Sequence, residues 1–182
     1  MKRVKYAGGH HYTRPGYGIE RLEKCIRRIQ ERYQVEVYLE PGEAIALNAG
    51  YLVTEILDVV ENGETTNLII DASAACHMPD VIEMPYLPPL YGTQEEGEGK
   101  EYRIGGPTCL AGDIVGDYCL GESLAPGDRL IFGDMAIYTM CKNNTFNGMP
   151  LPSIYLLKEN GDVEELVCFQ YEDFKRRLGT KK

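Results

Sequence analysis

The chain has 182 residues, a length that fits one large domain or parts of two. Hydrophobic residues make up 43% and charged residues 26%, which is enough apolar material for a packed core beneath an ordinary soluble surface. The net charge of −9 disfavours nucleic acid and anionic membranes as partners, and it suits a cationic small molecule.

Targeting and redox signals are few. No apolar run reaches about 18 residues, and no apolar stretch follows the basic start MKRVKYAGGHH. Neither a transmembrane helix nor a secretory signal peptide is therefore expected. The six cysteines form no CxxC pair and no zinc-type spacing with the three histidines. We expect no metal site, and reduced thiols in a cytoplasmic protein.

Residues 1–45 have the pattern of a strand, a helix and a strand. The runs at 4–7 and 35–39 are short β-type segments, the first ended by two glycines and the second by a Pro-Gly break. Between them, apolar residues recur at helical spacing: Ile19, Leu22, Ile26 and Ile29. This order is typical of parallel α/β units.

Residues 46–182 have the pattern of an all-β domain. Two β-rich runs flank Asn62-Gly63, a strong hairpin signal, and a later pair flanks Asn160-Gly161. A further β-rich run covers 128–140. Strands separated by such turns predict an antiparallel β-sandwich or barrel. The charged stretch 91–101 is expected to be a loop, and 171–182 a short helix with a basic tail.

The two patterns together predict an unusual division of the chain. One β-α-β unit cannot cover both faces of a parallel sheet, and its strands would leave unpaired edges. The predicted fold is therefore α/β plus all-β, with the last strands of a TIM-like (β/α)8 barrel over 1–45 and the β domain over 46–182. The N-terminal part of the barrel is expected to be missing, so the chain has the pattern of a fragment.

Five motifs place chemically useful side chains at strand ends or in loops. AGGHH at 7–11 offers backbone amides to an anion just before a helix. EPGE puts Glu40 at the carboxyl end of a strand, where α/β barrels carry their active sites. Taken singly, each motif fits an ordinary turn, a solvated loop or a core aromatic residue as well. The other three motifs are DASAACHMPD from Asp71, GGPTCLAGD with Cys109 and Asp113, and FGDMAIYTM with Tyr138.

Together and in this order, the motifs resemble the C-terminal portion of the carboxynorspermidine decarboxylase family over residues 4–178. That family belongs to the pyridoxal-phosphate-dependent, alanine-racemase-like group (fold type III), which also contains ornithine and diaminopimelate decarboxylases. GPTCxxxD is common to the wider group. EPGE followed by AIALNAGYLV, together with CHMPDVIEMPY, indicates the carboxynorspermidine branch.

The resemblance implies a pyridoxal 5'-phosphate site. Glu40 would face the pyridine nitrogen and keep it protonated, so that the ring can accept the electrons released as carbon dioxide leaves. Glu43 stands where the ornithine and diaminopimelate relatives usually have Arg, so backbone amides must carry more of the phosphate binding. The other cofactor-binding residues that the resemblance implies are Gly8, Gly9, His10, Gly42 and Tyr138.

The resemblance also implies catalytic and substrate-binding residues. Cys109 would enter the active site of the other subunit in a head-to-tail homodimer and handle the proton at the reacting carbon. Asp113 would lie near it, contacting substrate or orienting the loop. The substrate-binding positions implied are Asp71, Glu43 and His77, of which Asp71 would pair with the cationic tail of a polyamine-like substrate.

The expected function is decarboxylation of carboxynorspermidine or carboxyspermidine to norspermidine or spermidine, by a complete enzyme. One alternative is a truncated or split, inactive dimerisation or binding module that pairs with a complementing barrel half. This alternative arises because the family's cofactor-carrying lysine lies on an early barrel strand that is not found here. Leu87 also stands where relatives usually have Arg. Another alternative is decarboxylation of diaminopimelate, against which Glu43 and the CHMPD segment argue.

Overall fold

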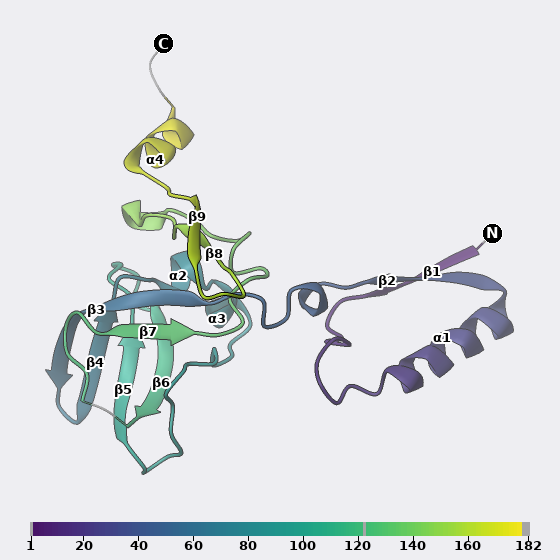
Figure 1. The fold of residues 1–182 in the computed structure, drawn as a ribbon, viewed down its shortest axis with the longest axis horizontal. Coiled ribbons are helices and arrows are strands. Elements are labelled where there is room, and N and C mark those ends of the chain that lie inside the picture. Colours follow the sequence, from purple (N-terminus) through teal and green to yellow (C-terminus); the bar gives the residue numbers. More distant parts are fainter. Residues whose placement is uncertain (1, 122, 180–182) are drawn as a thin grey trace.

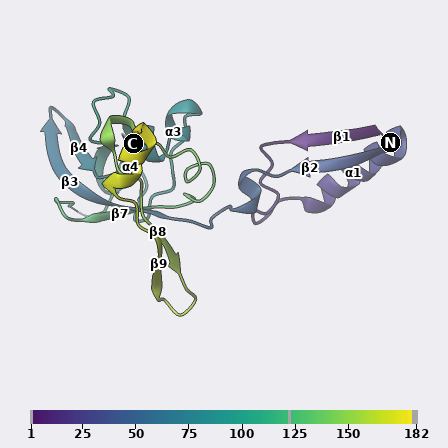
Figure 2. The same ribbon diagram turned by 90° about the horizontal axis from the view of Figure 1, so that it is seen from above.

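The computed structural model describes residues 2–121 and 123–179. Its first unit consists of strand β1 (Lys2–Ala7), helix α1 (Ile19–Tyr33) and strand β2 (Val35–Glu40). β1 and β2 pair in parallel, which confirms the expected strand–helix–strand order. The unit projects from the rest of the molecule and is joined to it by a linker that contains one short helical turn, as both Figure 1 and Figure 2 show.

The first unit has almost no interior. Helix α1 is amphipathic, but none of its residues is fully buried. Leu22, Ile26 and Ile29 are half-buried, whereas Tyr38 and Leu39 on β2 are exposed. Two parallel strands and one helix cannot enclose a core, so this unit needs cover from other elements to be stable.

The second unit is a five-stranded sheet in the order β6-β5-β4-β3-β7. Strands β3 and β4 form the hairpin predicted around Asn62-Gly63, and Gly63 has the positive φ of +63° that the turn requires. The bounds of the strands are Leu52–Asn62 for β3, Thr65–Ile70 for β4, Lys100–Gly105 for β5, Ile114–Leu120 for β6 and Arg129–Phe132 for β7.

The expectation of a purely antiparallel sheet is wrong for one pair of strands. β4 and β5 run parallel, while the other pairs in this sheet are antiparallel. A parallel pair needs a crossover connection, and the segment 71–99 supplies it. This crossover carries two short helices, α2 (Ala74–His77) and α3 (Asp80–Glu83).

The crossover also connects the two edges of the sheet, which therefore curls instead of forming a flat layer of a sandwich. Leu90 forms a bridge with Phe132 on β7, and Thr93 forms one with Leu120 on β6. The Tyr91 amide donates to the Ile131 carbonyl at 3.0 Å, and the Gln94 amide donates to the Cys119 carbonyl at 2.9 Å. The first residues of the stretch 91–101, which was expected to be a loop, therefore pair with both edge strands and close the sheet.

The core lies inside this curled sheet. Alternating residues of the strands point inward, as the burial patterns of β4, β5 and β7 show. Tyr118 and Phe132 pack edge to face with their ring centroids 6.1 Å apart. The most deeply buried large apolar residues, all at most 1% exposed, are Ile56, Leu68, Ile70, Met78, Ile104 and Phe132.

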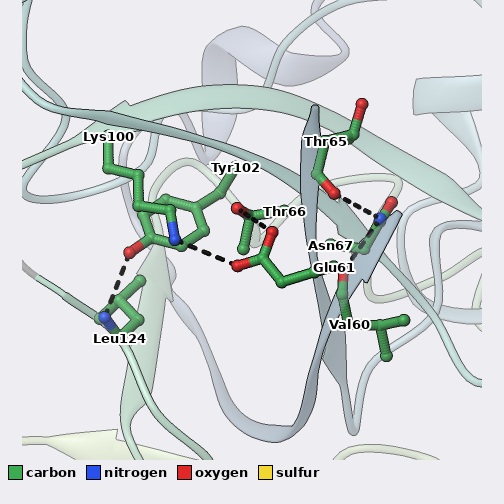
Figure 3. Close-up of polar contacts among 8 residues, drawn as sticks. All are labelled: Val60, Glu61, Thr65, Thr66, Asn67, Lys100, Tyr102 and Leu124. Atoms are coloured by element: carbon green, nitrogen blue, oxygen red, sulfur yellow. Dashed lines mark hydrogen bonds and ion pairs between the residues drawn. The ribbon is translucent and has the colours of Figure 1, made fainter. Parts of the chain in front are cut away.

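Polar contacts fasten β3, β4 and β5 near the hairpin turn (Figure 3). Glu61 accepts a hydrogen bond from Thr66 Oγ1 at 2.9 Å and pairs with Lys100 Nζ at 3.3 Å. Lys100 Nζ also lies 5.2 Å from the centroid of the Tyr102 ring, and the Leu124 amide donates to Tyr102 OH at 3.3 Å. These contacts stabilise the sheet at a site unconnected with the motifs singled out from the sequence.

The chain ends with a second hairpin and a helix. Strands β8 (Ile154–Leu157) and β9 (Val163–Val167) pair antiparallel around Asn160-Gly161, as predicted, and helix α4 spans Tyr171–Leu178. The basic tail expected at 180–182 lies outside the described residues. Within the described residues, no helix is both long and apolar enough to cross a membrane.

Candidate functional site

The carboxyl ends of β1 and β2 lie side by side. Ala7 is opposite Glu40 in the register, so the glycines that follow β1 and the carboxylate that ends β2 share one edge of the sheet. Gly8 and Gly9 have consecutive positive φ values of +66° and +72°, and no atom lies within 4 Å of a Cβ built on either. Such a turn leaves backbone amides accessible to an anion.

Glu40 has a partner that the sequence did not reveal. Lys5 Nζ lies 2.6 Å from Glu40 Oε1, and both side chains are largely exposed. The hydrogen bond that Lys5 donates to Glu40 raises the pKa of Lys5, which keeps this lysine a charged ammonium group. Cross-strand pairing explains the contact, because the Lys5 and Glu40 side chains leave the same face of two neighbouring strands.

Gly42 and Glu43 lie where the first unit joins the sheet. Gly42 precedes the short 3-10 helix η1 (Glu43–Ile45). Glu43 Oε2 pairs with His11 Nε2, and Thr13 Oγ1 donates to the Ala44 carbonyl at 2.5 Å. The loop after β1 is therefore tied to the segment after β2. Glu43 is occupied by a histidine here, and its role in substrate binding stays a prediction.

Tyr138 reaches Gly42 from a distant part of the chain. A Cβ built on Gly42 would lie only 2.7 Å from the Tyr138 hydroxyl, so a side chain at Gly42 would displace the phenol. Tyr138 itself has a positive φ of +33°, which is rare for a residue with a side chain. The structure thus brings together two of the residues predicted to bind the cofactor.

Lys142 is a second cation near the site that the sequence did not reveal. Its Nζ lies 5.4 Å from the centroid of the Tyr138 ring and 3.0 Å from Glu83 Oε2, and it also bonds to the buried Asp80. These carboxylates, Asp80 first, raise the pKa of Lys142 well above its usual range. Lys142 lies some 60 residues from Asp80 and Glu83 in the sequence, so no local sequence pattern could have indicated these ion pairs.

Asp71 begins the crossover directly after β4. Its Oδ1 accepts hydrogen bonds from the hydroxyl of the buried Thr54 and from the Glu55 amide, the latter at 2.9 Å. Both of these bonds end on the same oxygen, and the carboxylate is exposed. An exposed carboxylate with one fixed oxygen can pair with a cationic group.

His77 is not placed as a substrate contact would be. It is 2% exposed, its Nδ1 accepts from the Ser73 amide at 3.1 Å, and its Nε2 donates to the Pro150 carbonyl at 2.9 Å. Burial lowers the pKa of His77, which favours the neutral ring that these two bonds require. Substrate binding by His77 stays a prediction, and it has no support in this geometry.

Cys109 and Asp113 have opposite environments in one loop. Cys109 is a free, exposed thiol, whereas Asp113 is 4% exposed. Asp113 Oδ1 accepts from Ser73 Oγ at 2.8 Å and from the Ala75 amide at 3.1 Å, and its Oδ2 accepts from Thr108 Oγ1 at 2.6 Å. The carboxylate fixes the loop, while the thiol is presented at its surface.

The described residues fall short of a metal site and fit a phosphate cofactor better. In the part of the chain that the structure describes, no group of three or more His, Cys, Asp or Glu is arranged to hold a metal ion. A glycine turn with positive φ, a carboxylate at the same sheet edge and a tyrosine hydroxyl at Gly42 match the groups that pyridoxal phosphate needs. These donors are compatible with binding of a phosphate-bearing cofactor.

Comparison with known proteins identifies the family. Residues 13–136 match the family model of the pyridoxal-dependent decarboxylase C-terminal sheet domain, and the chain belongs to this family. It is 40% identical to the carboxynorspermidine/carboxyspermidine decarboxylase of Campylobacter jejuni, over 97% of this chain and 49% of the relative. It is 42% identical to the carboxyaminopropylagmatine decarboxylase of Synechocystis, over 97% of this chain and 46% of the relative.

Solved structures agree with this assignment. The crystal structure of carboxynorspermidine decarboxylase from Campylobacter jejuni, complexed with norspermidine, superposes with a TM-score of 0.85 at 37% identity. The match covers 97% of this chain and 51% of that chain. A diaminopimelate decarboxylase structure, 20% identical, shares the fold with a TM-score of 0.74. The chain therefore spans about half the length of the relatives that it matches.

Proposed function

We propose that this chain contributes to a pyridoxal-phosphate-dependent enzyme that decarboxylates carboxynorspermidine or carboxyspermidine to norspermidine or spermidine. The observation that carries the proposal is the shared edge of β1 and β2, where the Gly8-Gly9 turn lies beside Glu40 and Tyr138 reaches Gly42. The similarity to carboxynorspermidine/carboxyspermidine decarboxylases over nearly the whole chain supports it.

The residues at this edge would divide the binding of the cofactor. When bound, pyridoxal phosphate accepts the electrons released as the substrate loses carbon dioxide. The amides from Gly8 to His10 would hold its phosphate, with Gly42 and the Tyr138 hydroxyl beside them. Glu40 would keep the ring nitrogen protonated, and its ion-pair partner in this structure is Lys5.

The remaining residues would act on the substrate. Asp71 would bind the distal ammonium group through the oxygen that Thr54 and Glu55 leave accessible. In a head-to-tail homodimer, Cys109 of each chain would deliver a proton to the reacting carbon in the partner's site. The exposure of the thiol supports this role, because a thiol that reaches a neighbouring subunit must lie at the surface.

The substrates within this class differ in the cationic group at their distal end. The Synechocystis relative acts, by its name, on carboxyaminopropylagmatine, and its identity of 42% matches the 40% of the Campylobacter relative. Its substrate ends in a guanidinium group instead of an ammonium group. We favour the ammonium substrates because CHMPDVIEMPY resembles the carboxynorspermidine branch, and competition between the two substrates in one assay distinguishes them.

A second candidate function is that of an inactive dimerisation or binding module. It has support from the lysines nearest the site, since Lys5 and Lys142 are both engaged with carboxylates. The test is to incubate the 182-residue chain with pyridoxal phosphate, reduce with borohydride and measure the intact mass. We expect no lysine of the isolated chain to be modified and no carbon dioxide to be released from carboxynorspermidine.

Activity is expected from what we call the assembled enzyme, in which this chain is combined with the part of the Campylobacter jejuni relative that it does not cover. Carbon dioxide release by the mixture supports the decarboxylase proposal. A mixture that forms a complex and binds the cofactor, yet releases no carbon dioxide, favours the inactive module.

A further inference from the structure

A buried set of hydrogen bonds joins the Cys109 loop to the crossover. We call residues 106–113 the Cys109 loop. Its last residue, Asp113, accepts from Ser73 Oγ and the Ala75 amide, both of which belong to the start of α2. The other carboxylate oxygen accepts from Thr108, the neighbour of Cys109. One side chain therefore bonds to the thiol's own loop and to a helix about 40 residues away in sequence.

The same short helix is bonded on its other side to the segment that follows Tyr138. His77 Nε2 donates to the Pro150 carbonyl at 2.9 Å. The Asn144 amide donates to the Cys76 carbonyl at 3.0 Å, and Asn144 Nδ2 donates to the Ala75 carbonyl at 2.8 Å. This segment starts at Tyr138, whose carbonyl accepts from the Lys142 amide at 2.7 Å. Helix α2 thus lies between the Cys109 loop and the Tyr138 segment.

The members of this set are buried and mutually satisfied. Ser73 is fully buried, and His77 and Asp113 are at most 4% exposed. Ser73 is saturated as well, because its hydroxyl accepts from the Cys76 amide at 3.1 Å while donating to Asp113. Removing one member leaves another buried polar group without a partner, which costs more than the bond itself.

Gly106 shows how closely the loop fits this carboxylate. A Cβ built on Gly106 would collide with the Asp113 side chain, so glycine is required here for close approach. Both Asp113 oxygens already accept hydrogen bonds from the chain, and the carboxylate faces the interior. The geometry therefore suits Asp113 to holding the shape of the loop, whereas Cys109 is the residue exposed at its surface.

We propose that Ser73, His77 and Asp113 are positioning residues, which hold the Cys109 loop in a fixed relation to the Tyr138 segment through α2. The inference rests on the proposed function, because a fixed Cys109 loop matters only if Cys109 acts on the substrate. Asp71 lies two residues before Ser73, so the same anchor sets where the substrate-binding carboxylate enters the crossover. Fixed groups lose less freedom when they act on a substrate, which is the benefit of such an anchor.

The test measures the loop itself and needs neither cofactor nor substrate. In Ser73→Ala of the full chain, we expect amide hydrogen exchange across 106–113 to accelerate about tenfold, because Asp113 loses a donor. Exchange in the β5 and β6 interiors should stay unchanged.

Two controls separate this anchor from a general loss of stability. Thr66→Val removes another buried hydroxyl that bonds to a carboxylate, Glu61, and should leave 106–113 unaffected. Thr108→Val and Thr108→Ser form a matched pair near the thiol. The first loses the bond to Asp113 and should accelerate exchange, while the second keeps the hydroxyl and should restore slow exchange.

Unchanged exchange at 106–113 in Ser73→Ala would overturn the proposal, as would equal acceleration in Thr66→Val. If Ser73→Ala does not fold, the Thr108 variants provide the test. Exchange at 106–113 that is equally slow in Thr108→Val and Thr108→Ser would then overturn the proposal. Failure of the proposed function looks different. If the loop responds as expected but Cys109→Ala turns over normally in the assembled enzyme, the anchor is real and the catalytic role of Cys109 is wrong.

Discussion

The β1-α1-β2 unit and the curled sheet differ in how completely they are packed. The helix of the first unit has no buried residue, whereas the sheet encloses Ile56, Leu68, Ile70 and Phe132 at no more than 1% exposure. The proposed cofactor turn belongs to the first unit and the Cys109 loop to the second. From this difference we expect the sheet to preform its share of the proposed site alone, whereas the proposed cofactor turn depends on added packing.

The largest expected effect tests the share of the site that the sheet preforms. In the assembled enzyme, Cys109→Ala should lower turnover by about 10²–10⁴-fold, because a positioned proton donor contributes that much. Cofactor binding, which depends on the other unit, should be unchanged, as measured by absorbance titration with pyridoxal phosphate. Cys25→Ala, which removes another exposed thiol, is the matched control and should keep full activity. Normal turnover in Cys109→Ala would contradict the assignment.

The packing difference itself can be tested by mutation. Phe132→Ala should destabilise the sheet by about 3–5 kcal/mol, because it leaves a cavity in a fully buried site. Ile26→Ala on the half-buried face of α1 should leave the unfolding of the sheet unchanged. Hydrogen exchange at increasing urea, resolved by region, measures both. Equal destabilisation of the sheet by the two variants would show that the units fold as one.

A smaller effect is expected at Asp71. Asp71→Asn in the assembled enzyme should lower kcat/KM roughly 10–150-fold, which corresponds to a loss of about 1.5–3 kcal/mol of binding free energy. The reason is that a charge-assisted contact becomes neutral. The loss should appear mainly in KM. Glu55→Gln, at an adjoining position whose amide rather than side chain bonds to Asp71, is the control. Unchanged kcat/KM in Asp71→Asn would remove Asp71 from the substrate site.

The smallest effect concerns His77 and the pH dependence of stability. Burial lowers the pKa of His77 in the folded chain from its ordinary value of 6.5. Below about pH 6.5 the unfolded chain therefore binds a proton that the folded chain resists, and the free energy of unfolding decreases as the pH falls. Urea denaturation at pH 7.5 and 5.5 should show this decrease in the native chain and less of it in His77→Gln. An equal decrease in the free energy of unfolding of both proteins would show that His77 is not the group responsible.

Local patterns allowed much of the fold to be predicted. The hairpins at Asn62-Gly63 and Asn160-Gly161 follow from turn chemistry that involves only neighbouring residues. Helix α1 follows from the spacing of its apolar residues. The parallel pairing of β4 and β5 could not be predicted, because helices of four residues, such as α2 and α3, are too short to show a period.

The candidate site was predictable in its parts but not in its contacts. Motifs marked Glu40, Cys109 and Tyr138, because each was expected near the end of a strand or in a glycine-rich loop. The pairing of Lys142 with Asp80 and the enclosure of Asp113 by α2 depend on tertiary packing between distant segments. Sequence patterns carry no signal for such contacts, and so could not show that Asp113 and His77 are buried. The expected roles of Asp113, in contacting substrate or orienting the loop, and of His77, in substrate binding, stay predictions.

The most direct test of the central claim is carbon dioxide release from carboxynorspermidine, measured for this chain alone, for the uncovered part of the Campylobacter jejuni relative alone, and for the assembled enzyme, each with pyridoxal phosphate. We expect release by the assembled enzyme only, because the cofactor turn needs the packing that the first unit lacks. Release by this chain alone, or none from an assembled enzyme that binds the cofactor, would contradict it.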